Sequence, residues 1–134
     1  MGRRLNASGR TVPLILLVED DPDSRSELRL LLEDEGFAVI EARDGQTAIS
    51  LAGREPPDVV VQDLLLPDIP GFELLRALRR LPGSHEVPVV ALSAFDERLD
   101  EARRGEIGFS ACLRKPADLA RLPEVLRRIV PPSA

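Results

Sequence analysis

Short aliphatic runs that end in or beside a polar residue constrain the fold of this chain more than any other feature of its sequence. Five such runs occur, separated by segments with leucine or alanine at helical spacing. The runs are Leu14 to Val18, Phe37 to Ala42, Val59 to Val61, Val87 to Leu92, and a short one within 108–114. Continuous aliphatic runs are typical of strands buried on both faces. Strands that alternate with helices predict a parallel sheet with helices on both faces and right-handed crossovers.

The segments between the runs carry helix start and stop signals. Asp21-Pro22 reads as an N-cap followed by proline at the first helical position, and Gly36 is a stop signal for that helix. Asp44-Gly45 begins a second, weaker helix. A third helix begins near Phe72 and ends at Pro82-Gly83. These signals predict five helices between and after the strands, in the order of an α/β domain.

Two of the expected helices depart from a regular pattern. The segment 96–104 is strongly charged and offers only Leu99 and Ala102 for burial, so we expect a loosely held helix. Asp118 is expected to cap the last helix. Pro123 would remove a hydrogen bond inside that helix, which predicts either a kink or a helix that begins near it.

Length and composition exclude several classes of protein for this chain. The 134 residues predict one domain at 13–130, with a flexible tail at 1–12 and a short tail at 131–134. The net charge of -5 argues against direct binding of nucleic acid. No apolar run approaches the roughly 20 residues of a membrane span, so no membrane association is expected. Cys112 is the only cysteine, which excludes an internal disulfide and predicts a reducing, cytoplasmic location.

Polar side chains stand at the carboxyl ends of four expected strands. They are Glu19 and Asp20 after the first run, Asp63 after the third, Ser93 after the fourth and Lys115 after the fifth. In a doubly wound five-stranded parallel sheet ordered 2-1-3-4-5, the first and third strands are neighbours, so Asp20 and Asp63 should face each other across a crevice. Carboxylates about 5 Å apart repel by roughly 3 kcal/mol at an effective dielectric near 20. A divalent cation would relieve this repulsion, and ligands that are all oxygen favour Mg²⁺. A solvated acidic edge without an ion is the alternative.

Lys115 is the only lysine among the 18 basic residues, all the others being arginine. Lysine carries a compact point charge, whereas arginine presents a broad planar fork. Retention of one lysine at a strand end therefore indicates a position where a compact charge is needed. Chance retention on the surface is the alternative.

Four sequence blocks resemble the receiver domain of response regulators in bacterial two-component systems. The blocks are LLVEDD at 16–21, DVVVQDLLLPD at 58–68, ALSA at 91–94 and LRKP at 113–116. Each block is weak by itself, but together they stand in order on the expected strands and cover about residues 12–130. The resemblance implies the flavodoxin-like fold of receivers and a phosphorelay function.

The resemblance implies the following phosphoacceptor and metal site. Asp63 would take a phosphoryl group from the phosphohistidine of a partner histidine kinase or histidine phosphotransfer protein. Mg²⁺ would be bound directly by Asp20, by Asp63 and by the backbone carbonyl of Leu65, with Glu19 acting through a water molecule. His85, the only histidine, stands in a loop after the third helix, so we expect a solvated residue and a donor from another protein or domain.

The same resemblance implies a switch region. Ser93 and its neighbour Ala94 would follow the phosphoryl group, and Lys115 would pair with it. Cys112 stands where receivers often carry an aromatic residue that reports phosphorylation, and a cysteine has too little reach for that movement. We interpret Cys112 as a small, half-buried strand residue, with a redox-sensing thiol as the alternative.

Three functions compete at this stage. The leading hypothesis is a phosphoacceptor signalling module, a monomer or weak dimer, that is no enzyme beyond its own phosphotransfer and slow dephosphorylation. No effector domain is expected after Val130, so its output would reach an unknown partner through protein contacts. The alternative is a receiver-like scaffold that binds partners without being phosphorylated. A phosphomonoester hydrolase is a third possibility, but such enzymes generally use a second acid two residues after the nucleophile, where this chain has Leu65.

Overall fold

The computed structural model describes residues 11–104 and 108–130. Most of the tail predicted at 1–12, and all of that at 131–134, therefore lies outside the described residues. The strands are β1 (Leu14–Val18), β2 (Ala38–Ala42), β3 (Val59–Asp63), β4 (Val89–Ser93) and β5 (Ala111–Arg114). The helices are α1 (Pro22–Asp34), α2 (Gly45–Arg54), α3 (Gly71–Arg79), α4 (Asp96–Arg104) and α5 (Leu122–Ile129), the last preceded by a 3₁₀ turn at Leu119–Arg121.

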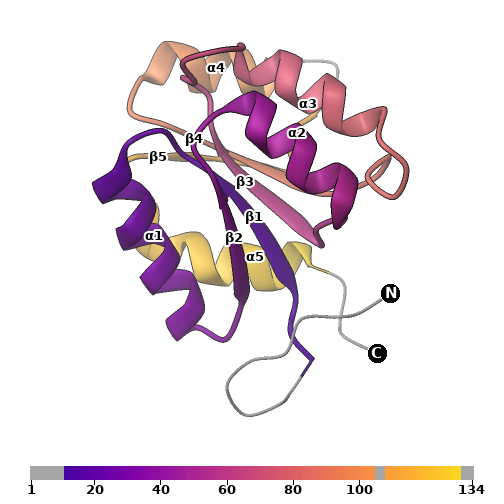
Figure 1. Ribbon diagram of the computed structural model, residues 1–134. Coiled ribbons are helices and arrows are strands. Elements are labelled where there is room, and N and C mark those ends of the chain that lie inside the picture. Colours follow the sequence, from indigo (N-terminus) through magenta and orange to yellow (C-terminus); the bar gives the residue numbers. More distant parts are fainter. Residues whose placement is uncertain (1–10, 105–107, 131–134) are drawn as a thin grey trace.

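The five strands form one parallel sheet in the order β2-β1-β3-β4-β5, which confirms the predicted doubly wound, flavodoxin-like topology (Figure 1). The register aligns the carboxyl ends of the central strands. Val18 lies opposite Gln62, and Asp63 lies opposite Leu92, one residue before Ser93. The residues that follow β1 and the last residues of β3 and β4 therefore meet at one edge of the sheet.

Helices cover both faces of the sheet, with α1 and α5 on one face and α2, α3 and α4 on the other (Figure 1). The alternation of side chains along each strand explains this division. On β1, Ile15 and Leu17 pack with Leu28 of α1 and Leu126 of α5, whereas the intervening Leu16 packs with the α2 and α3 side. Both faces of the central strands are thus buried, as their continuous aliphatic sequences predict.

The helix starts follow the predicted signals in α1 and α2. The Asp21 carboxylate accepts a hydrogen bond from the Ser24 N–H at 2.9 Å, and the Asp44 carboxylate accepts one from the Thr47 N–H at 2.8 Å. In α4, Leu99 and Ala102 are buried, and the looseness of that helix stays a prediction. Among the described residues no helix is both long and apolar enough to cross a bilayer.

The start of α5 differs in part from expectation. Pro123 is the second residue of α5, so the helix begins beside the proline rather than bending at it. The prediction that Asp118 caps this helix is wrong, because its carboxylate instead accepts the Arg114 N–H at 2.9 Å. A turn after β5 brings Asp118 back to the end of that strand, and the 3₁₀ turn begins with the Leu119 N–H donating to the Pro116 carbonyl.

Two strands begin later than their aliphatic sequences suggest. The strand predicted from Val87 begins at Val89, because Pro88 has no N–H to donate to a neighbouring strand. The strand predicted within 108–114 is confined to Ala111–Arg114. Both strands nevertheless end where the functional residues were expected, at Ser93 and just before Lys115.

Candidate functional site

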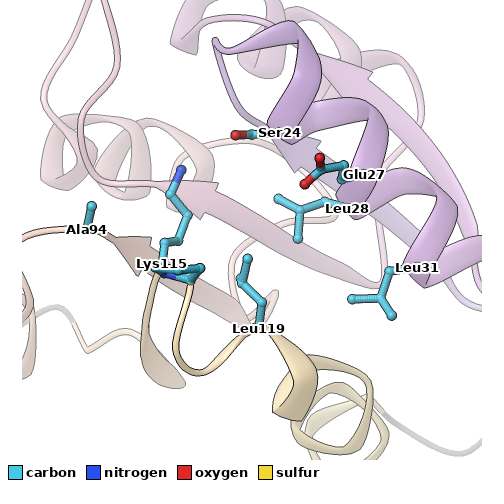
Figure 2. Close-up of a pocket in the computed structure, with 8 residues that line it drawn as sticks. Ser24, Glu27, Leu28, Leu31, Ala94, Lys115 and Leu119 are labelled. Carbon is cyan, nitrogen blue, oxygen red and sulfur yellow. The ribbon is translucent and has the colours of Figure 1, made fainter.

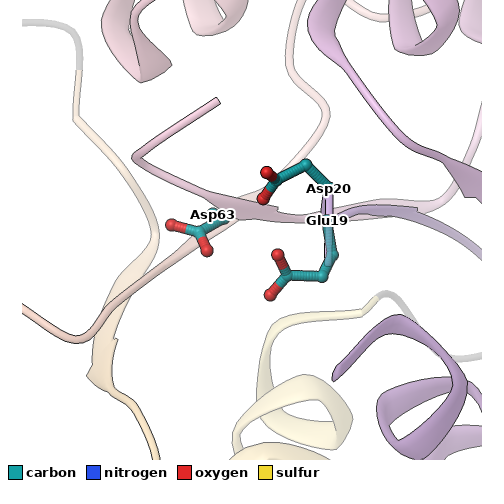
Figure 3. A group of neighbouring side chains, drawn as sticks. All are labelled: Glu19, Asp20 and Asp63. Atoms are coloured by element: carbon teal, nitrogen blue, oxygen red, sulfur yellow. The ribbon is translucent and has the colours of Figure 1, made fainter. Parts of the chain in front are cut away.

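Three carboxylates converge at the carboxyl edge of the sheet. Glu19 and Asp20 follow β1, and Asp63 ends the neighbouring β3 (Figure 3). One carboxylate oxygen from each residue lies within 4.8 Å of the others. Glu19 and Asp63 are buried, with 1% and 7% of their surface exposed, whereas Asp20 is exposed. The predicted proximity of Asp20 and Asp63 is confirmed.

Lys115 brings a positive charge into this cluster from the segment after β5. Its ammonium Nζ lies 2.7 Å from Asp63 Oδ2 and also forms an ion pair with Glu19. Its backbone N–H donates to the Ser93 carbonyl at 2.9 Å, which continues the pairing of β4 with β5 and fixes the start of the side chain. Lys115 was expected to have a specific role because it is the only lysine, and it contacts both buried acids.

Burial and neighbouring groups shift the pKa values of Glu19 and Lys115. Burial raises the pKa of the Glu19 carboxyl; the hydrogen bond from Lys115 opposes this shift, and the nearby Asp63 charge adds to it. Burial by itself would lower the pKa of Lys115, but hydrogen bonds to Asp63 and Glu19 outweigh burial and raise it. The lysine is therefore held in its charged form between the two acids.

Backbone groups hold the acids in place. The Leu65 N–H donates to Asp63 Oδ1 at 2.9 Å, and the Asp21 N–H donates to Glu19 Oε2 at 3.3 Å. Arg25 of α1 donates from Nη1 to the Glu19 carbonyl at 2.9 Å, so it fixes the segment after β1. Sequence reasoning missed this role of Arg25. Basic residues are frequent on the faces of helices, and nothing local points to a carbonyl partner.

The donor set suits a hard divalent cation. It consists of carboxylate oxygens from neighbouring strands, and the exposed Asp20 leaves the cluster open to solvent. Such oxygens are the ligands that Mg²⁺ prefers. Leu65 is the second residue after β3 and is 46% exposed, and the use of its carbonyl as a ligand stays a prediction.

The predicted switch residues lie on the adjoining strands. Ser93 is fully buried at the end of β4, and its Oγ accepts the Phe95 N–H at 3.0 Å. Ala94, the next residue, is exposed. These positions place a hydroxyl and a small residue one strand away from Asp63, and their roles in signalling stay predictions.

Cys112 is half-buried on β5 opposite Ala91 and packs against a small cluster that includes Leu99 and Ala102. Burial raises the pKa of the Cys112 thiol, although the charge of Arg103 opposes the shift. A thiol with a raised pKa has little reactive thiolate at neutral pH. The structure therefore favours the interpretation as a small, half-buried strand residue. His85 is exposed in the loop between α3 and β4, as expected.

A groove of about 420 Å³ adjoins the site between α1 and the segment that precedes α5 (Figure 2). Its α1 side is formed by Ser24, Glu27, Leu28 and Leu31, and its other side by Ala94, Lys115, Pro116 and Leu119. Leucine side chains from both sides meet in the groove, and the Lys115 side chain rises at one end of it (Figure 2). An apolar surface of this kind, beside a charged centre, can receive a helix or loop of another protein.

Two polar residues around Asp63 were also missed from the sequence. Gln62 is fully buried, and its Nε2 donates to the Gly71 carbonyl at the start of α3 at 3.0 Å. The Asp68 carboxylate accepts the N–H groups of Gly45 and Gln46 at the start of α2, each at 2.8 Å. Aspartate between turn-forming residues often accepts backbone N–H groups. That signal was available for Asp68, but its partners lie more than 20 residues away in the chain.

The chain is similar to known proteins over most of its length. An uncharacterised 14.6 kDa protein of Leptolyngbya boryana is 41% identical over 123 residues, which are 90% of this chain and 94% of that protein. The transcriptional regulatory protein CpxR of Escherichia coli is 39% identical over 118 residues, or 85% of this chain and 49% of CpxR. This chain therefore spans about half the length of that relative.

A solved structure extends the comparison to the fold. The receiver domain of a sensor histidine kinase from Pseudomonas aeruginosa superposes with a TM-score of 0.75 at 30% identity, covering 88% of this chain and 97% of that one. Its structure was solved with a magnesium ion coordinated in the active site cleft. A family model for the response regulator receiver domain matches residues 15–127. Because that model spans the sheet, its helices and the acidic cluster, the chain belongs to the family of response regulator receiver domains.

Proposed function

We propose that this chain is the phosphoacceptor of a two-component phosphorelay and that Asp63 carries the phosphoryl group. The observation that supports this most strongly is the contact of Asp63 with a single lysine ammonium, 2.7 Å away, beside two further carboxylates. Receiver domains generally accept phosphoryl groups on an aspartate at this edge of the sheet. The proposed donor is a phosphohistidine of a histidine kinase or histidine phosphotransfer protein.

The proposed transfer is an in-line displacement at phosphorus. An oxygen of Asp63 forms a bond to phosphorus as the bond from phosphorus to the donor imidazole breaks, and the imidazole nitrogen leaves with the electron pair of that bond. Negative charge on the phosphoryl oxygens must be neutralised during this step. Lys115 already carries a positive charge at Asp63 and needs no large movement to provide it.

The proposed metal site consists of Asp20 and Asp63, the backbone carbonyl of Leu65, and Glu19 through a water molecule. Bound Mg²⁺ would supply further positive charge for the phosphoryl oxygens and would neutralise the acidic cluster. The magnesium ion in the related receiver domain from Pseudomonas aeruginosa supports this assignment. Asp20 has the most open position for exchange of the ion because its carboxylate is exposed.

The donor protein is proposed to dock at the groove between α1 and the segment that precedes α5. The groove is lined by Lys115 at one end and by apolar side chains such as Leu28 and Leu119 along its length. A donor helix placed there would bring its histidine near Asp63. Phosphorylation is proposed to shift an existing equilibrium through Ser93, Ala94 and α4 and so to alter an output surface.

The test is incubation with Mg²⁺ and acetyl phosphate, followed by intact-mass measurement. We expect a gain of one phosphoryl group in the wild-type protein and in Asp58→Asn, and none in Asp63→Asn. Asp58 is a matched control because it immediately precedes β3 at its other end, where its carboxylate accepts the Leu14 N–H at 2.7 Å. The rate at which the adduct disappears measures the proposed slow dephosphorylation.

Other outcomes would favour the competing functions. A wild-type protein that gains no mass, although it is folded and Mg²⁺ is present, would contradict the proposal and favour an unphosphorylated scaffold. Rapid, continuous hydrolysis of several phosphomonoesters would favour a hydrolase instead. A gain that persists in Asp63→Asn would show that another residue is the acceptor.

A further inference from the structure

Asp68 connects the loop after the phosphoacceptor to the start of α2. It lies in the segment 64–70, between Asp63 and α3. Its Oδ1 accepts the Gly45 N–H and its Oδ2 accepts the Gln46 N–H, each at 2.8 Å. These are N–H groups of the first turn of α2, which have no partner within the helix. Asp68 therefore supplies α2 with hydrogen bonds from a distant part of the chain.

Helix α2 already has a cap of its own. The carboxylate of Asp44, the residue just before the helix, accepts the Thr47 N–H at 2.8 Å. The two carboxylates thus satisfy different donors of the same helix end. Asp44 is local to α2, whereas Asp68 belongs to the loop that follows Asp63. Removal of either should weaken α2, but only removal of Asp68 should free the loop.

Steric contact between the loop and α2 is a second, independent observation. A Cβ placed on Gly45 would lie 2.4 Å from Ile69 Cγ1 and 3.3 Å from Asp68 Oδ1. The loop therefore rests directly on the first residue of α2, and a larger side chain there would force Ile69 to move. This packing explains why the helix begins with glycine rather than with a better helix former.

The rest of the loop is bound at its two ends. Near Asp63, the Leu64 N–H donates to the Leu92 carbonyl at 2.9 Å, and the Leu65 N–H donates to the Asp63 carboxylate. At the far end, Gln62 holds the Gly71 carbonyl. Asp68 lies between these ends, so its bonds to α2 restrict the part of the loop that the end contacts do not reach.

We propose that Asp68 is a positioning residue for the metal site. By fastening the loop 64–70 to α2, it keeps Leu65 and the Asp63 carboxylate in the arrangement that binds Mg²⁺. This inference rests on the proposed function. If the loop has the binding arrangement in only a fraction of the molecules, the apparent dissociation constant of the ligand equals the intrinsic constant divided by that fraction. We expect about a fivefold rise in the dissociation constant of Mg²⁺ in Asp68→Ala, the factor that corresponds to the ~1 kcal/mol typical of a capping carboxylate.

Thermodynamic reciprocity provides a second measurement. If the contact between Asp68 and α2 strengthens Mg²⁺ binding, then Mg²⁺ must strengthen that contact by the same factor. The backbone amides of Gly45 and Gln46 should therefore exchange their hydrogens more slowly when Mg²⁺ is present. The same comparison in Asp68→Ala should show no change at these amides.

The experiment compares three proteins: wild type, Asp68→Ala and Asp44→Ala. Calorimetric titration with Mg²⁺ alone measures affinity, nuclear magnetic resonance measures amide exchange, and thermal unfolding in EDTA measures stability. We expect both variants to lose similar stability, but only Asp68→Ala to bind Mg²⁺ about fivefold more weakly. Asp68→Asn, which keeps one carbonyl acceptor, should fall between Asp68→Ala and wild type, and it serves if the alanine variant does not fold.

The outcomes separate this inference from the proposed function. If Asp68→Ala binds Mg²⁺ as tightly as wild type, or if Asp44→Ala loses as much affinity, Asp68 is merely a helix cap and the inference is overturned. If the wild-type protein binds no Mg²⁺ at all, the proposed metal site fails and the inference fails with it.

Discussion

Replacement of Asp20 by asparagine should stabilise the metal-free protein while it removes the response to Mg²⁺. Asp20 is exposed, and its carboxylate makes no hydrogen bond or ion pair with the described part of the chain. It nevertheless lies beside two other carboxylates, those of Glu19 and Asp63. Its charge therefore adds repulsion to the folded state and has no hydrogen bond or ion pair of its own there, which is typical of a residue retained for binding rather than for stability.

The separation of the oxygens gives the size of the effect. At 4.8 Å, the upper limit of these separations, two unit charges repel by about 0.9 kcal/mol in bulk water and by about 3.5 kcal/mol at an effective dielectric of 20. Because Asp20 is exposed, the value for water is the better guide, and attraction to Lys115 offsets part of the two repulsions. We therefore expect a gain of about 1 kcal/mol in the free energy of unfolding, or about 4 °C in Tm for a chain of this size.

The chain has neither tryptophan nor tyrosine, so far-UV circular dichroism rather than intrinsic fluorescence should follow unfolding. In EDTA, Asp20→Asn should unfold at a higher temperature than wild type. When Mg²⁺ is present at about 100 times its dissociation constant, the free energy of unfolding of wild type should rise by about 2.7 kcal/mol and that of the variant by far less. Wild type should then unfold at the higher temperature. Glu86→Gln removes one charge from an exposed loop residue and controls for net charge. A variant less stable than wild type in EDTA would refute the electrostatic reasoning.

Three further predictions concern other parts of the molecule. Lys115→Met should lower the free energy of unfolding in EDTA by about 3 kcal/mol, measured by urea denaturation, because it leaves two buried acids without their cation; a gain in stability would contradict this. Leu126→Ala, at a fully buried position of α5, should cost about 3 kcal/mol in the same assay, and a cost below that of a surface substitution would contradict the packing described here. The hydrogen bond from the Ser24 N–H lowers the pKa of Asp21 in the folded state below 3.8, its ordinary value. The ionised Asp21 carboxylate therefore stabilises the fold fully above pH 3.8, and this stabilisation is lost as the pH falls through the folded pKa. The stability difference between wild type and Asp21→Asn, measured from pH 7 downward, should therefore diminish below pH 3.8 and should be constant above it.

Much of the architecture could be predicted from the sequence because it depends on local patterns. Aliphatic runs such as Val59 to Val61 cannot be solvated along their length, so they predict buried strands wherever they occur. Asp21 could be recognised as a cap because its partner lies three residues away. The convergence of Asp20, Asp63 and Lys115 could also be predicted, because parallel strands must bring their carboxyl ends to one edge of the sheet.

For several other polar groups, the hydrogen-bond partners became known only from the tertiary fold. A carboxylate binds whichever N–H groups the fold brings near it, and sequence distance says little about that choice. Asp118 was expected to cap a helix but binds the end of β5, whereas Asp68, in a loop, caps α2. Local patterns were sufficient to predict the strands, the helices and the edge where the acids gather, apart from a few element bounds, because burial and helix capping act over a few residues. The contacts of those acids with Lys115, and those of Asp68 with α2, arise only when distant segments pack together.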